Sequence, residues 1–275
     1  MKRSNEKIKI GILGCGAIGS GIAKSIFKEL KEFCELTALH DTDRQKAIQL
    51  EKSLPVDNVI KDSLAELLES CDLMVEAVNA KETATIIRQA IEAQKDVLAM
   101  STGKLLNASD LFELANKCNS CILLPSGAIA GIDAIKAASL RSIEQITLTT
   151  RKPPTGFEGN PYIQKKGMDL SKVSGETIIF EGNVDDAVTH FPKNINVAAT
   201  LSLASRAKEK LVIRIITSPD FKNNSHEIEV RGDFGCMTTK TENVICPDNP
   251  KTSYLAVLSG IASLKGFCSY LKVGT

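Results

Sequence analysis

Short apolar runs alternate, through the first 125 residues, with segments whose apolar residues recur every three or four positions. The runs are typical of buried strands, and the spaced segments are typical of amphipathic helices. Strands joined by helices imply right-handed βαβ units around a parallel sheet. We therefore expect strands over 7–13, 35–40, 73–77, 96–100 and 121–124, with helices over 18–30, 44–52, 64–68, 81–93 and 108–117.

The pattern changes after residue 124. Strands are expected over 145–150 and 177–180, and then over 211–217, 226–231 and 236–241 as consecutive antiparallel neighbours. Residues 151–176 are rich in proline and glycine, which predicts a long irregular loop, a segment type that is often a functional lid or disordered. Shorter helices are expected over 132–139, 185–190 and 197–204, and a last helix over 253–271 after the turn at 247–250.

A glycine motif, Gly14-x-Gly16-x-x-Gly19, lies between the first expected strand and helix. Gly14 permits a tight turn, Gly16 lets a pyrophosphate approach the backbone, and Gly19 lets helix and strand pack closely. The N–H groups at the helix start, near Ala17 and Ile18, would face the negative charge. The alternative is a glycine turn with only a structural role. Lys7 and Lys9 leave too short an apolar run for a secretory leader ending at Cys15.

Asp41 follows the second expected strand, about 20 residues beyond the glycines, where an acidic side chain accepts hydrogen bonds from a ribose. It favours NAD over NADP, although Arg44 and Lys46 can soften that choice. Strand ends should supply further cofactor contacts, with plain turn residues as the alternative. The predicted fold is α/β, with a Rossmann dinucleotide-binding domain (1–125 plus the helix 252–272) and an α+β catalytic and oligomerisation domain (126–251). The expected strand-end contacts are Ala77, Ser101, Thr102 and Ala128.

Composition excludes several classes of function. The formal net charge is +1 and Trp is absent, which disfavours nucleic-acid binding and acidic membranes. Eight widely spread cysteines in a chain of this length do not indicate a disulfide framework, and a reducing, cytoplasmic compartment is expected. Cys118-x-x-Cys121 lacks a second pair of ligands, so we expect no metal site.

The three histidines are candidates for proton transfer, because imidazole titrates near neutrality. His40 lies at the ribose end of the expected sheet, and His190 is expected at the surface. His226 begins a strand and alternates with Ile228 and Val230, so it is either catalytic or a structural histidine.

The runs that carry a family resemblance are residues 14–19, 125–134, 191–204, 224–228, 230–235 and 248–256. They are similar to sequences of the L-aspartate dehydrogenase family, and the similarity spans essentially the whole chain. The resemblance implies oxidation of L-aspartate to iminoaspartate with NAD or NADP, the imine passing to quinolinate synthase for NAD biosynthesis or hydrolysing to oxaloacetate and ammonia. It also implies that His226 is catalytic and that Asn196 and Ala128 contact the cofactor.

In the expected mechanism, a neutral His226 accepts a proton from the substrate amine, and Asn224 orients the substrate or the imidazole. The two substrate carboxylates need cationic partners. A homodimer is expected, since the β-rich domain offers a sheet face to cover. The alternatives are a dehydrogenase related to homoserine dehydrogenase or dihydrodipicolinate reductase, and an NAD-binding sensor that does not need His226. The candidate cations are Arg151, Lys193, Arg231 and Lys251.

Overall fold

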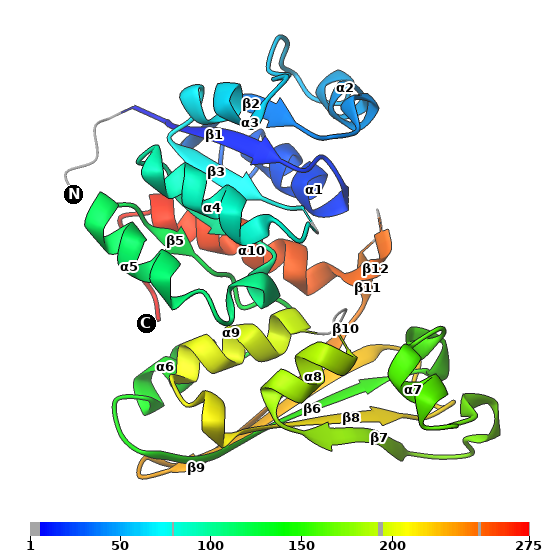
Figure 1. Ribbon diagram of the computed structural model, residues 1–275. Helices are drawn as coiled ribbons and strands as arrows, with labels where there is room; N and C mark the ends of the chain where they lie inside the picture. The colour runs from blue at the N-terminus through cyan, green and yellow to red at the C-terminus, as the bar shows by residue number, and fades with distance from the viewer. Residues whose placement is uncertain (1–5, 79, 192–194, 247–248, 275) are drawn as a thin grey trace. The chain divides into compact units, whose positions relative to one another are not determined.

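The computed structural model describes residues 6–274 apart from 79, 192–194 and 247–248. The chain forms two compact units (Figure 1). The first runs to Pro125 and includes Val257–Val273, and the second comprises Ser126–Ala256 with Gly274. Each unit has its own five-stranded sheet, and the predicted α/β fold class is confirmed.

The first unit contains a parallel sheet of order β2-β1-β3-β4-β5. The order reverses direction between β1 and β3, which is where open α/β sheets bind ligands. The strands are β1 (Ile8–Leu13), β2 (Cys34–His40), β3 (Leu73–Glu76), β4 (Asp96–Ala99) and β5 (Ile122–Leu123). The helices are α1 (Ala17–Ile26), α2 (Arg44–Lys52), α3 (Leu64–Glu69), α4 (Thr83–Glu92), the 3-10 turn η1 (Thr102–Leu105) and α5 (Ser109–Cys118).

Two apolar clusters sandwich this sheet, so its strands read as continuous apolar runs. One cluster joins Ile10 and Ile22 to Leu264 of the last helix, α10 (Tyr254–Cys268). A side chain at Gly260 of α10 would come within 2.8 Å of the Met100 sulfur, which explains the small residue there. The C-terminal helix thus completes the core of the first unit, although it ends three residues earlier than expected.

Helix α1 ends at Ile26, whereas the apolar spacing predicted a helix to Leu30. The N–H of Phe27 already bonds to the Lys24 carbonyl in a tighter turn, and the Leu30 N–H reaches the Ser25 carbonyl. Leu30 is nonetheless fully buried. The turns after Ile26 carry Leu30 into the core four residues on, as one more helical turn would have done. The apolar spacing therefore predicted a helix that was too long.

The second unit is built on a mixed sheet of order β10-β9-β6-β8-β7. The prediction of three consecutive antiparallel neighbours was wrong for β8 and β9, because β6 lies between them, parallel to β8 and antiparallel to β9. Strand β6 is long and buried from Ile146 to Thr150, which suits it to the centre. The strands are β6 (Ile143–Lys152), β7 (Thr177–Gly182), β8 (Leu211–Thr217), β9 (Asn224–Gly232) and β10 (Gly235–Asn243).

Helices α6 (Ile132–Ala138), α8 (Val184–His190) and α9 (Ile195–Ser205) lie along one face of this sheet (Figure 1). A 3-10 turn, η5 (Lys208–Lys210), leads into β8. Residues 249–250 of the expected turn instead begin β12 (Asn249–Ser253), which pairs with β11 (Ile245–Cys246), and residues 247–248 lie outside the described residues.

The prediction of one long irregular loop over residues 151–176 was wrong. The segment contains η2 (Pro154–Phe157), helix α7 (Pro161–Lys165) and η3 (Leu170–Lys172). The Asn160 carboxamide caps α7 by accepting the N–H groups of Tyr162 and Ile163. Phe157 is buried, and the Tyr162 ring lies 4.4 Å from that of His190, which is therefore half-buried rather than a surface residue.

Candidate active site

The glycine loop of the first unit has the shape that a dinucleotide requires. Gly14 has φ +96°, and a Cβ there would lie 2.6 Å from the Ala77 carbonyl oxygen. A Cβ on Gly19 would lie 1.9 Å from the Gly14 carbonyl oxygen. Gly16 is exposed with open space above it, and as the N-cap of α1 it leaves the helix start without a side-chain cap. These observations fit a bound pyrophosphate, which would sit over Gly16 at the α1 N-terminus.

Asp41 fastens this loop to the end of β2. Its carboxylate accepts the Cys15 N–H at 2.8 Å and the Asp43 N–H at 2.8 Å. The nearby cations already have acidic partners, because Arg44 pairs with Asp62 and Lys46 with Asp43. The Nδ1 of His40, just before Asp41, lies 2.9 Å from the Lys61 carbonyl oxygen, which gives this histidine a structural role.

Glu76 is a buried carboxylate at one of the expected strand ends, to which the sequence analysis gave no role of its own. It ends β3 beside the glycine loop and accepts the N–H groups of Val78 and Ser101, each at 3.0 Å, with the Ser101 hydroxyl 2.8 Å away. Burial raises the pKa of the Glu76 carboxyl above its ordinary value. The carboxylate thus holds together the strand ends at which Ala77 and Ser101 were predicted, and Thr102 follows them, buried at the start of η1.

A second group of polar residues gathers at one end of the sheet in the second unit. His226 lies directly across from Thr150, and the Thr150 Oγ1 is 3.0 Å from the His226 Nδ1. Both side chains are buried, on the sheet face that carries α8 and α9. Asn224, two residues before His226, begins β9 on the same face.

The ionisation of His226 is strongly perturbed. Burial and the positive charge of Lys152 lower the His226 pKa to about 3, so the imidazole is neutral at ordinary pH. Lys152 ends β6 two residues after Thr150, and burial lowers its own pKa to about 8. Lys152 was missed by the sequence analysis. The alternation of β6 could have found it, since Thr150 and Lys152 share a face.

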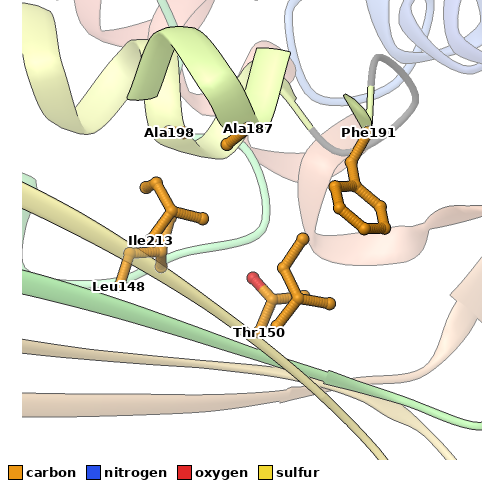
Figure 2. Close-up of a pocket in the computed structure, with 7 residues that line it drawn as sticks. Leu148, Thr150, Ala187, Phe191, Ala198 and Ile213 are labelled. Atoms are coloured by element: carbon orange, nitrogen blue, oxygen red, sulfur yellow. The ribbon is translucent and has the colours of Figure 1, made fainter. Parts of the chain in front are cut away.

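A water-sized hollow of about 10 Å³ adjoins this polar group beneath α8 and α9 (Figure 2). Figure 2 places Thr150 below Phe191, with Leu148 and Ile213 farther along the same face. The lining is apolar apart from the Thr150 hydroxyl. An apolar wall next to buried Thr150 and His226 keeps the local dielectric low, which is the physical cause of the shifted pKa of the imidazole.

Ala128 lies in the second unit, and its backbone is fixed by strand β10. Its carbonyl accepts hydrogen bonds from the Thr241 hydroxyl at 2.7 Å and the Asn243 Nδ2 at 3.0 Å. Thr241 pairs with His226 across β9 and β10. The Ser126–Ala128 turn is therefore joined to the histidine strand. Asn196 is exposed near the start of α9.

Two of the four predicted carboxylate-binding cations are not in this polar group. Arg151 and Arg231 alternate with the site residues and so face the other side of the sheet. Arg151 pairs there with Glu227 at 3.1 Å. Lys193 and the side chain of Lys251 lie outside what the structure describes. Among the described residues, the fold places the cation Lys152 beside His226.

Neither a metal-binding cluster nor a helix able to span a membrane is found among the described residues. No cluster of three or more His, Cys, Asp or Glu side chains there is arranged to hold a metal ion. None of the helices found there combines the length and the apolar character needed to cross a bilayer.

Comparisons with known proteins match both units. The family model described as the C-terminal domain of aspartate dehydrogenase matches residues 133–267, and that of the homoserine dehydrogenase NAD binding domain matches residues 14–125. The chain is 43% identical to the L-aspartate dehydrogenase of Methanosarcina barkeri over 98% of its length and 100% of that protein. For the Methanosarcina mazei and Methanococcus maripaludis C7 enzymes of the same name, identity is 44% and 38%, with the same coverage.

The fold is also similar to that of solved structures. The aspartate dehydrogenase of Thermotoga maritima superposes with a TM-score of 0.71 at 24% identity, covering 98% of this chain and 100% of the other. A homoserine dehydrogenase from Thiobacillus denitrificans gives a TM-score of 0.61 at 15% identity, covering 94% and 72%. Full-length identity to the curated relatives, together with the matched C-terminal model, shows that the chain belongs to the L-aspartate dehydrogenase family.

Proposed function

We propose that this protein is an NAD(P)-dependent L-aspartate dehydrogenase, which oxidises L-aspartate to iminoaspartate. The observation that carries the proposal is the buried, neutral His226, held by Thr150 beside a lysine, in a chain of this family. A neutral imidazole has an unprotonated nitrogen that can receive a proton from a substrate amine.

In the first unit, the glycine loop would hold the pyrophosphate and Asp41 the adenosine ribose. NAD is the expected cofactor and NADP a possible second one. Because Arg44 and Lys46 are already paired with carboxylates, a 2′-phosphate would have to compete for them and would face the charge of Asp41. Further contacts are proposed from the backbone of Ala17 and Ile18 and from Ala77, Ser101, Thr102, Ala128 and Asn196.

In the second unit, His226 would contact the amino group of L-aspartate and Asn224 would orient the substrate. Nδ1 of the imidazole is occupied by Thr150, which leaves Nε2 for the amine. The tautomer with the proton on Nδ1, donated to Thr150 Oγ1, is the one in which Nε2 accepts. The bound nicotinamide supplies the acceptor for the hydride from the substrate Cα.

The first experiment is a substrate panel with the purified protein. Reduction of NAD and of NADP is followed by absorbance with L-aspartate, L-glutamate, L-alanine and L-homoserine. Selective turnover of L-aspartate is expected, with NAD preferred. Turnover of L-homoserine instead would favour the homoserine dehydrogenase alternative.

The variant H226A separates an enzyme from a sensor. Loss of turnover is expected while NAD binding, measured by fluorescence titration, stays unchanged. A wild-type protein that binds NAD but oxidises none of the four amino acids would refute the proposal and favour the sensor.

Three finer proposals accompany the activity. All eight cysteines are thiols rather than disulfides, which supports a reducing, cytoplasmic location. The sheet of the second unit carries exposed Ile178 on an outer strand, a feature that supports a homodimer, and light scattering after size exclusion tests it. A coupled assay with quinolinate synthase, scoring quinolinate against oxaloacetate, tests whether iminoaspartate is handed on before it hydrolyses.

A further inference from the structure

The side chain of Lys152 is placed to act together with His226. Both residues lie on the helix-covered face of the sheet, on adjacent strands, and Lys152 is diagonal to the Thr150–His226 pair. The two side chains are close enough for the charge on Lys152 to oppose protonation of His226. The fold therefore brings two proton-binding nitrogens to one end of the sheet.

The surroundings of Lys152 hold its side chain in place. A Cβ built on Gly156 would lie 3.4 Å from the Lys152 Cβ and 3.5 Å from its Cδ, so the lysine stem runs against this turn. The backbone carbonyl of Lys152 accepts the Thr217 hydroxyl at 2.9 Å. On the two flanking strands, β8 presents Thr217 and β9 presents His226 to this face, whereas charged Arg151 and Glu227 face the opposite side.

His226 alone is poorly matched to the proton that the reaction releases. The amino group of L-aspartate is protonated at neutral pH, and its nitrogen must lose a proton before its lone pair can form a C=N bond. With a pKa of about 3, the imidazole can receive that proton only briefly. Lys152, with a pKa of about 8, holds a proton stably and is partly neutral at mildly alkaline pH. General bases work best when their pKa lies near the working pH.

We propose that Lys152 is a second catalytic residue of the aspartate dehydrogenase reaction and that its Nζ is the atom that finally takes the proton of the substrate amine. The inference rests on the proposed function. An N–H bond of the substrate ammonium breaks, its electron pair stays on the substrate nitrogen, and a new N–H bond forms at Nζ, either directly or by relay through the His226 imidazole. The amine becomes neutral, Lys152 becomes positively charged, and nothing is oxidised or reduced in this step.

The first test does not require the cofactor. Lysines are reductively methylated with ¹³C-formaldehyde, and the methyl resonances are followed against pH. We expect one resonance that titrates near pH 8 in the wild type and is missing in K152R. The same resonance should persist in K240M, a matched control at an exposed lysine on β10. A wild-type spectrum in which every lysine titrates near pH 10 would overturn the proposal.

The second test is the pH dependence of kcat/KM for L-aspartate. The wild type should lose activity as the pH falls below about 8, because Lys152 becomes protonated. K152M should lose roughly 10²–10⁴-fold. K152R, which keeps the charge but cannot deprotonate in this range, should lose a similar factor together with the inflection near pH 8. K240M should match the wild type.

The two proposals fail in different ways. If the wild type oxidises L-aspartate and either K152M or K152R keeps its rate and pH profile, Lys152 is not the proton acceptor and the proposed function stands. If the wild type does not oxidise L-aspartate at all, both proposals fall. Circular dichroism shows whether K152R and K152M are folded. If K152M does not fold, the activity and pH profile of folded K152R decide the question.

Discussion

The Thr150 hydroxyl oxygen lies 3.0 Å from Nδ1 of His226, across a register pair of strands β6 and β9. Both side chains are buried, so the contact is shielded from water and fixes the ring. Since one ring nitrogen is occupied in this way, only the other is left for the proton-accepting role that we propose for His226. The hydroxyl therefore acts as a positioning group for the histidine.

Replacing Thr150 by valine, which keeps its shape, should impair catalysis through the histidine. Without the hydroxyl, the imidazole loses its partner at Nδ1 and the productive tautomer is no longer fixed. We expect kcat for L-aspartate to fall on the order of 10²-fold. NAD affinity should be unchanged, because Thr150 is not among the residues proposed to contact the cofactor. T150S restores the hydroxyl and should recover most of the activity, whereas a serine variant as slow as the valine variant would argue against this role.

Two glycines of the same motif should respond differently to alanine. A methyl group at Gly19 would lie 1.9 Å from the Gly14 carbonyl oxygen, so G19A should lower the free energy of unfolding by about 3 kcal/mol. A methyl group at Gly16 meets nothing within 4 Å. G16A should cost less than about 1 kcal/mol.

The same pair separates folding from cofactor binding. In G16A the methyl group occupies the space through which a pyrophosphate would approach the backbone. The Kd for NAD should therefore rise at least tenfold, which corresponds to a loss of about 1.4 kcal/mol in binding free energy. The free energy of unfolding in urea should be nearly unchanged. Wild-type NAD affinity in G16A would show that the dinucleotide does not pass over Gly16.

Glu76 should be needed for both stability and cofactor binding. In E76A the N–H groups of Val78 and Ser101 lose their acceptor in a buried site, and we expect a loss of about 2–4 kcal/mol in unfolding free energy. E76Q keeps one acceptor oxygen, so its unfolding free energy should lie between those of E76A and the wild type. Both variants should bind NAD more weakly, because the strand ends that Glu76 joins would separate. E69Q, at an exposed glutamate, is the matched control and should change neither measurement.

Local patterns predicted most of the elements but not which strands pair. Arg44–Lys52 was predicted as a polar helix and Leu211–Thr217 as a strand, both at their observed bounds. The predicted pairing of β8 with β9 was wrong. Strand β6 lies between them, and this order depends on contacts between residues far apart in the sequence. The segment 151–176 was also misread. Its prolines and glycines suggested irregularity, whereas Asn160 and buried Phe157 organise it.

Only those parts of the candidate site that have a local sequence signal were predicted. The glycine motif is a local signal, and its geometry fits the predicted cofactor loop. His226 was singled out by residue type and family resemblance. Lys152 and Glu76 belong to common residue types in unremarkable sequence contexts, and only burial beside specific partners sets them apart. Arg151, one position from Lys152, was one of the four candidate cations, although strand alternation turns it to the other face.

The depressed pKa of His226 predicts how stability changes with pH. In the unfolded chain a histidine has its ordinary pKa near 6.5, whereas in the folded protein the His226 pKa is about 3. Between these values the unfolded state binds more protons than the folded one, so the unfolding free energy must fall as the pH falls from 6.5 towards 3. The slope from this one group is at most about 1.4 kcal/mol per pH unit.

Urea unfolding of the full chain at pH 7, 6, 5 and 4 measures this slope. H226Q removes the titrating ring. Its unfolding free energy should therefore fall less steeply with falling pH than that of the wild type, with a difference in slope of up to that value. Parallel curves for the two proteins would mean that His226 is solvated and titrates normally, which would also remove the reason for assigning the final proton to Lys152.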